Sequence, residues 1–194
     1  MEIGDRPEVT NATTNPYTAY DDDIQVKLLA KKSDIQSDNY IGVPFFLEFA
    51  MSDDGTRIAY GNWGYDKDGE NNIGKVEVYD VKNGEFEKIG DTIYGNHSNS
   101  HAGSSVSLSN DGTYLAVGEI GFEGNGCIFD DCGRTRVFTN FNDEGDQSSW
   151  EMVSEGITGE LNSLSGKSVS LSKEGTRIAI GEPFSSGDLG RVRV

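Results

Sequence analysis

A ten-residue phrase that occurs three times constrains this chain more than any other feature of its sequence. The phrase reads SDDGTRIAYG at 52–61, SNDGTYLAVG at 109–118 and SKEGTRIAIG at 172–181. In each copy an acidic residue and a glycine separate the end of one apolar segment from the start of the next, which is the signature of a tight β-hairpin. Recurrence after about 60 residues indicates a chain built from equivalent structural units.

Each repeat predicts four strands in the same order. The first two strands flank the hairpin turn. The third strand follows a variable loop, and in the first repeat it alternates apolar Val76 and Val78 with charged Lys75 and Glu77, which indicates a strand with one wet face. The fourth strand is centred on 86–93 in the first repeat and on 150–157 in the second. Four antiparallel strands without a helical pattern predict an all-β chain made of β-propeller blades.

The repeats place three blades in this chain, the last of them incomplete. Since a propeller needs about four to eight blades to close, we expect either a longer polypeptide, association of copies through open blade edges, or a lone strand that covers one edge; the first is favoured. The expected divisions are a flexible lead-in at 1–23 and a repeat segment at 24–194, with a lone strand at 24–36 and blades at 44–95, 102–159 and 165–194.

The first strands of the repeats differ in bulk. They read AGSSVSL at 102–108 and SGKSVSL at 165–171, but FFLEFAM at 45–51. Glycine and serine inside a strand indicate close approach of another layer. The bulky first copy is typical of a terminal unit with a different neighbour.

Charge excludes some classes of partner. The chain carries 33 acidic and 16 basic residues, a net charge of −17, so nucleic acid and anionic membranes are repelled. No apolar run reaches the roughly 20 residues of a membrane helix, and the first residues lack the features of a signal peptide.

Cys127 and Cys132 either close a small disulfide loop, which we favour, or remain free thiols.

With the repeats laid out, SGKSVSLSKEGTRIAIGEP at 165–183 followed by GRVRV at 190–194 resembles FG-GAP-type propeller repeats, the family that includes the integrin α-chain head. AGSSVSLSNDGTYLAVGE at 102–119 carries the same resemblance. The resemblance implies a seven-bladed propeller, an extracellular or cell-surface location, and a noncatalytic role in binding proteins or glycans.

In some integrin-like members a blade loop binds calcium through alternating oxygen ligands. The nearest segment here places oxygen-bearing side chains at every second position, namely Asp66, Asp68, Glu70 and Asn72. Calcium favours several hard oxygen ligands on a flexible loop. The corresponding loops of the other repeats lack the pattern, so a solvated acidic turn is the favoured alternative. We expect no other cofactor.

The loops of unequal length, 62–73, 119–132 and 182–189, are the expected recognition surface. Trp63 and Tyr65 on the first loop either stack on a sugar or partner side chain, or cap the blade edge. The histidine pair His97 and His101 lies in a Ser/Asn-rich segment without helical pattern, which argues against zinc. We predict no catalytic residue. The alternative function is a fragment of a propeller-fold hydrolase or lyase with its catalytic groups outside this segment.

Overall fold

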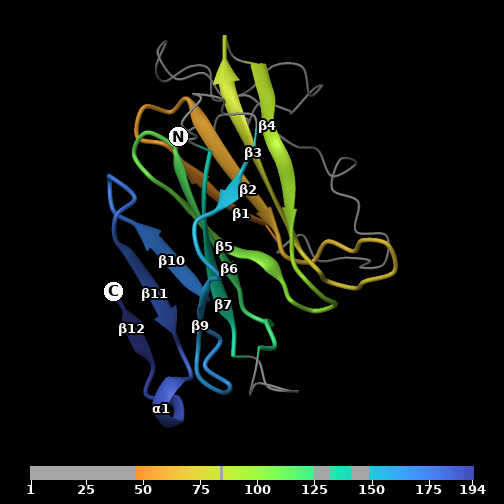
Figure 1. The fold of residues 1–194 in the computed structure, drawn as a ribbon, viewed down its shortest axis with the longest axis vertical. Helices are drawn as coiled ribbons and strands as arrows, with labels where there is room; N and C mark the ends of the chain where they lie inside the picture. The colour runs from red at the N-terminus through yellow and green to blue at the C-terminus, as the bar shows by residue number, and fades with distance from the viewer. Residues whose placement is uncertain (1–46, 84, 125–131, 141–148) are drawn as a thin grey trace, which may run out of the picture.

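The computed structural model describes residues 47–83, 85–124, 132–140 and 149–194, which form three antiparallel β-sheets (Figure 1). The first sheet contains β1 (Leu47–Met51), β2 (Arg57–Asn62), β3 (Lys75–Lys82) and β4 (Glu85–Tyr94), in that order. The second contains β5 (Ala102–Leu108), β6 (Tyr114–Glu119) and β7 (Arg134–Thr139), and β7 pairs with both β8 (Glu151–Met152) and β9 (Ile157–Thr158). The third contains β10 (Ser168–Leu171), β11 (Ile178–Glu182) and β12 (Arg191–Arg193). A short helix, α1 (Ser185–Asp188), precedes β12.

The sheets pack side by side as successive blades of a β-propeller. In Figure 1 they follow one another from orange through green to blue, and β5 contacts β1 and β2 on one side and β10 on the other. Parallel bridges join Gly74 to Ala102 and Gly133 to Ser165, from each sheet to the next. The predicted all-β, four-stranded blades are confirmed. The predicted lead-in at 1–23 and lone strand at 24–36 lie outside the described residues.

The repeated phrase forms the predicted hairpin, and its polar side chains close the turn. Ser52 Oγ accepts from Arg57 N at 3.0 Å and donates to Asp54 Oδ1 at 2.7 Å, and Asp54 Oδ1 also accepts from Thr56 N at 3.0 Å. The second turn, 109–114, has the same set of bonds. The turn glycines share a left-handed backbone that other residues resist: Gly55, Gly112 and Gly175, with φ of 71°, 69° and 68°.

Successive hairpins are bonded to one another. Asp53 N donates to Asn110 O at 3.1 Å, and Asn110 N donates to Lys173 O at 2.9 Å. Arg57 reaches from the first sheet to the second turn, where its Nη1 donates to Gly112 O at 2.9 Å. A Cβ on Gly112 would lie 2.7 Å from Arg57 Cδ, so this side chain covers the bare glycine. Equivalent positions in each repeat therefore join one sheet to the next.

The core lies between the first two sheets. Alternate residues of β2, β3 and β4 face alternate residues of β5, β6 and β7, because successive side chains of a strand point to opposite faces. The buried cluster contains Ala59, Val76, Val78, Ile93, Leu108, Leu115, Val117 and Phe138.

Backbones approach closely where the first strands carry glycine. A Cβ on Gly61 would lie 2.6 Å from Gly103 O, and one on Gly118 would lie 2.1 Å from Gly166 O. Contacts this short exclude any side chain at these positions. The crowding predicted from the small residues of the first strands is confirmed.

Two features differ from the sequence prediction. The fourth strand of the second sheet is split into β8 and β9, because Gly156 turns the chain (φ 96°) against the Arg134 side chain. The charged residues at alternate positions of β7, Arg134 and Arg136, are also buried, unlike the solvent-exposed face predicted for the third strand of the first repeat. In the described residues no helix has the length and apolar character needed to cross a membrane.

Candidate functional site

The connections at one end of the sheets form the candidate binding surface, which we call the loop face. It comprises residues 63–74, 95–101, 120–124, 132–133, 159–167 and 183–190. Backbone hydrogen bonds fix the first two connections to each other, with Asn99 N donating to Asn71 O at 2.7 Å and His101 N to Asn72 O at 3.1 Å. Figure 1 shows these two connections together at the lower right. The longest described loop is therefore held by its neighbour.

Both predicted ligand-contact residues lie on the loop face. Trp63 is half-buried, with its ring edge-on to His101 at a centroid distance of 5.1 Å, and His101 Nδ1 donates to Trp63 O at 3.2 Å. Tyr65 is half-buried 6.0 Å from the Tyr94 ring, and Lys75 Nζ lies 4.7 Å from the Tyr65 ring centroid. Burial raises the pKa of Tyr65. Each ring thus packs partly on the protein and keeps part of its surface exposed.

The acidic segment 66–72 forms a tight hairpin of its own. Lys67 and Glu70 exchange both backbone hydrogen bonds, at 3.0 and 2.8 Å. Asp68 and Gly69 between them have φ of 51° and 89°, the left-handed pair that a two-residue hairpin loop requires. The Asp–Gly sequence therefore sets the shape of this loop.

Two of the four predicted calcium ligands, Asp66 and Glu70, accept hydrogen bonds from backbone amides. Asp66 Oδ1 accepts from Asn72 N at 2.7 Å, and Glu70 Oε2 accepts from Ser98 N at 2.9 Å on the neighbouring connection. The Asp68 side chain is mostly exposed. Within the described ranges, no group of three His, Cys, Asp or Glu residues is placed to hold a metal ion. The calcium site stays a prediction.

His97 links connection 95–101, in which it lies, to connection 120–124. Its Nδ1 donates to Ser98 O at 2.9 Å, and its Nε2 accepts from Glu123 N at 3.3 Å. A carbonyl can only accept and an amide N–H can only donate, so these bonds require the neutral ring with its proton on Nδ1. The ring also packs on Phe122 at 6.0 Å. His97 and His101 thus have separate structural contacts.

A buried ion cluster supports the loop face from beneath. Glu119 is fully buried, and Arg134 Nε donates to its Oε2 at 2.8 Å. Arg136 Nη2 donates to Glu119 Oε1 and, across the sheet boundary, to Tyr94 O at 2.7 Å. Burial lowers the pKa of Arg136, and the Glu119 charge opposes that shift. The Arg134 guanidinium lies 3.8 Å from the Phe122 ring centroid, so the cluster positions the loop above it.

The third sheet repeats this cluster near the surface. Arg191 Nε donates to Glu182 Oε2 at 2.7 Å, and Arg193 Nη1 donates to Glu182 Oε1 at 3.0 Å and to Thr158 O of the second sheet at 2.9 Å. Burial pushes the pKa of Glu182 up, but the bonds from the two arginines outweigh it and the pKa is lowered. In the first sheet, the residue at the position of Arg136 and Arg193 is Glu77.

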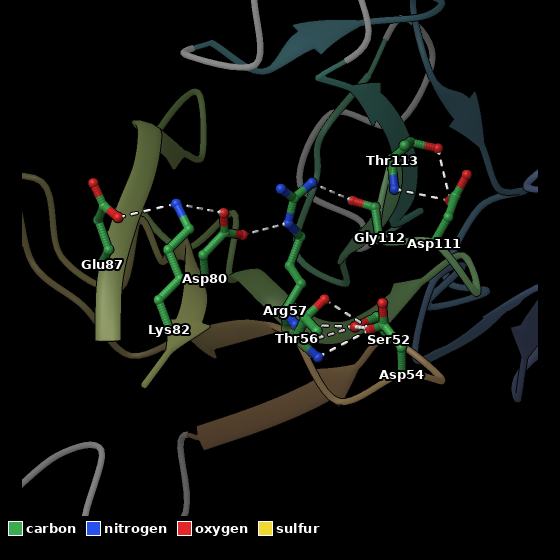
Figure 2. Close-up of polar contacts among 10 residues, drawn as sticks. All are labelled: Ser52, Asp54, Thr56, Arg57, Asp80, Lys82, Glu87, Asp111, Gly112 and Thr113. Carbon is green, nitrogen blue, oxygen red and sulfur yellow. Dashed lines mark hydrogen bonds and ion pairs between the residues drawn. The ribbon is translucent and has the colours of Figure 1, made fainter. Parts of the chain in front are cut away.

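A second candidate site lies beside the hairpin turns, at the other end of the strands. Figure 2 shows Arg57 between Asp80, whose Oδ1 accepts from Arg57 Nε at 2.7 Å, and Gly112. Lys82 Nζ lies 3.5 Å from Asp80 Oδ2 and 3.0 Å from Glu87 Oε2. These charges are paired within the first sheet, and Arg57 also reaches the second sheet through its bond to Gly112 O. The hollow beside them, the turn pocket, has a volume of about 270 Å³ and is lined by Thr56, Arg57, Asp80, Val81, Lys82 and Asp111.

The predicted disulfide falls at the edge of the described chain. Cys132 is fully buried, and its carbonyl accepts from Ser163 Oγ at 2.9 Å. Cys127 lies outside the described residues. The pairing of Cys127 with Cys132 stays a prediction.

Sequence reasoning missed the ion clusters and the turn pocket. The clusters do have a signal, because glutamate ends the second strand at Glu119 and Glu182 and the third strand then begins with arginine at alternate positions. The turn pocket has none, since it depends on the contact of Arg57 with the following repeat.

Comparisons with known proteins add similarity of structure only. No family model and no curated protein matches the chain. It is similar to the periplasmic gluconolactonase PpgL of Pseudomonas aeruginosa, with 18% identity and a TM-score of 0.47 over 76% of this chain and 38% of that one. It is also similar to Kuenenia stuttgartiensis hydrazine synthase, with 18% identity and a TM-score of 0.45 over 76% of this chain and 44% of that one. The chain thus spans less than half the length of either protein.

Proposed function

We propose that this chain is a noncatalytic β-propeller segment that binds a protein or a glycan through its loop face. The observation that carries the proposal is that Trp63 and Tyr65 keep part of their rings exposed on a connection whose backbone is bonded to residues 99–101. A loop already fixed in place loses little conformational entropy on binding. Rigid strands with variable connections are a common basis for recognition.

The chemistry of the loop face suits a neutral or cationic ligand. Aromatic rings stack on the apolar face of a sugar or on a partner side chain. The exposed side chains of Asp68, Asn71 and Asn96 lie on the same connections and offer hydrogen-bonding groups. The net charge of −17 disfavours nucleic acid.

Four carboxylates of the described residues have a pKa displaced in the direction opposite to that of a general acid. The carboxylates of Asp54, Glu77, Asp111 and Glu182 all have a pKa below its ordinary value, so they stay ionised at neutral pH. A general acid needs the opposite displacement. The alternative, a propeller-fold hydrolase or lyase with catalytic groups outside this segment, is favoured only by the polar turn pocket. Such an enzyme would convert the ligand that it binds. Analysis of the products after prolonged incubation of the ligand with the protein detects this conversion.

Substitution of the half-buried rings of Trp63 and Tyr65 tests the proposal. A glycan array and a panel of extracellular protein domains identify a ligand, which is then titrated against the chain. We expect Trp63→Ala and Tyr65→Ala each to weaken binding by at least about tenfold, with melting midpoints measured to confirm folding. Phe49→Ala removes an exposed ring outside the loop face and should leave affinity unchanged. Undiminished binding by the Trp63→Ala, Tyr65→Ala double variant contradicts the proposal.

Membership of the FG-GAP-type family, a seven-bladed full propeller, an extracellular location and self-association through blade edges belong to the same proposal. They rest on the sequence resemblance and the open edges of the sheets.

The calcium prediction has a direct test. Because Asp66 and Glu70 are bonded to backbone amides, we expect millimolar calcium to leave the melting midpoint unchanged. A midpoint that rises with calcium in the parent chain, but not in Asp68→Asn, would instead establish the metal site.

A further inference from the structure

The face of the third sheet that points away from the second sheet is bare of neighbours among the described residues. We call it the trailing face and define it by Lys173, Arg177, Gly181, Gly190, Val192 and Val194. Val192 and Val194 are 68% and 91% exposed, whereas Val76 and Val78, at the same positions of the first sheet, are 0% and 1% exposed. The second sheet buries those two valines, so the trailing face has the composition of a sheet interface.

Glycine positions on the trailing face follow the two interfaces already made. A Cβ on Gly74 would lie 2.2 Å from Ala102 O, and one on Gly133 would lie 2.2 Å from Ser165 O. Gly190 keeps the same left-handed backbone, with φ of 71° against 76° and 71°, although a Cβ there would meet only carbonyl groups of its own loop. Its backbone is already in the conformation that the other two use for docking.

The hairpin of the third sheet offers the same bonding groups. The amides of Asp53 and Asn110 each donate to the next hairpin, and Lys173 at the equivalent position is exposed. Arg57 covers the turn glycine of the second sheet, and the equivalent Arg177 is exposed.

We propose that the trailing face is a docking surface for a further blade that carries glycine where the second sheet has Gly103, in β5, and the third sheet has Gly166, just before β10. Each existing interface seats such a glycine against the second strand of the preceding sheet, at Gly61 and at Gly118. Gly181 holds that position on the trailing face, where a Cβ would meet only Ser168 of its own sheet.

A second copy of this chain does not fit, because its exposed leading edge is the first sheet. Phe46, which lies outside the described residues, aligns in sequence with Gly103, and even a Cβ on Gly103 would lie 2.8 Å from Lys75 O. The first sheet also has Glu77 where Arg136 and Arg193 bind carbonyl groups of the preceding sheet. The occupant is therefore a blade like the second and third, not the first.

An extended chain tests the proposal. A second copy of residues 138–194 is appended after Val194, which continues the repeat in register because Val194 is equivalent to Val137. We expect hydrogen exchange at the Lys173 amide to slow to the rate of the Asn110 amide. Val192→Lys should leave the melting midpoint of the parent chain unchanged and lower that of the extended chain by at least about 4 °C.

Matched variants separate docking from general stability. Thr135→Lys, at the position of Val192 in the buried interface of the second sheet, should lower both midpoints. Gly166→Phe in the appended copy alone should restore fast exchange at Lys173. Fast exchange at Lys173 in the unmodified extended chain, whether or not the added residues fold, overturns the proposal. So does a dimer of the parent chain that Val192→Lys dissociates, since the occupant is then a second copy.

Discussion

At the scale of single residues, one carboxylate organises each of the first two hairpins. The Thr56 amide is the main cause of the lowered pKa of Asp54, with the hydroxyls of Ser52 and Thr56 adding to it. At Asp111 burial pushes the pKa up, but the bonds from Thr113 and Ser109 outweigh it. Both carboxylates are thus more stable as anions in the folded chain than in the unfolded one.

These shifts predict a loss of stability in acid. A group whose pKa is lowered by folding contributes stability that is fully present above its pKa in the unfolded chain, near 3.9 for aspartate. This contribution is lost as the pH falls through the pKa in the folded chain. The double variant Asp54→Asn, Asp111→Asn keeps the acceptor oxygens but cannot titrate. We expect its melting midpoint to fall less than that of the parent between about pH 5 and pH 2.

Asp53→Asn is the matched control for the single variant Asp54→Asn, because both remove one charge from the first turn and Asp53→Asn leaves the Asp54 hydrogen bonds unaltered. The melting midpoint of Asp53→Asn should fall with pH about as much as that of the parent. Parallel curves for the parent and the double variant would show that the turn carboxylates do not contribute to acid sensitivity.

At the scale of elements, one sequence pattern gives two environments. Glu119 of β6 with Arg134 and Arg136 of β7 is enclosed by the neighbouring sheets. Glu182 of β11 is also fully buried, but the side chains of Arg191 and Arg193 in β12 remain 33% and 37% exposed. The two clusters therefore respond differently to loss of the acid.

We expect Glu119→Leu to lower the free energy of unfolding by about 3–5 kcal/mol, because two buried guanidinium groups lose their counter-charge. Glu182→Leu should cost about 1 kcal/mol or less, since water solvates the arginines that remain. Urea unfolding of both variants measures the difference. Equal losses of unfolding free energy in Glu119→Leu and Glu182→Leu would mean that burial of the arginines does not determine how much each substitution destabilises the chain.

Local sequence predicted the elements better than the contacts between them. The Asp–Gly turns and the burial of alternate valines in β3 depend on neighbouring residues, and they are found as predicted, whereas Lys75 and Glu77 on the face predicted to be wet are only 16% and 14% exposed. Burial of Arg134 and Arg136 was not predicted, because alternating charge normally marks a wet face and only the packing of another sheet reverses it. The placement of Trp63 and Tyr65 on a loop was predicted, but their contacts with His101 and Tyr94 come from a connection distant in sequence.

At the scale of the whole molecule, stability is expected to be uneven. The buried cluster joins the first two sheets and includes no residue of the third. In the third sheet only Ile180 and Glu182 of the strand residues are buried. Fewer buried contacts mean a lower free energy of local opening.

We therefore expect hydrogen exchange to proceed from the third sheet inward. Amides of β10, β11 and β12 should exchange faster than those of β2 and β6, and small amounts of denaturant should widen the gap. Mass spectrometry of the intact chain after timed exchange and digestion gives the order. A single rate for all three sheets would indicate one cooperative unit instead.

The bonds between successive hairpins bear on how genes for such chains can change. Asp53 with Asn110, and Asn110 with Lys173, use backbone atoms of the same repeat position, so the contact is independent of the side chain there. A recombination event that inserts one whole repeat carries both partners with it and leaves the flanking contacts intact. An event that ends inside a repeat leaves one hairpin without the neighbouring hairpin to which its backbone bonds. These hairpin contacts therefore require repeats to be gained or lost as complete units.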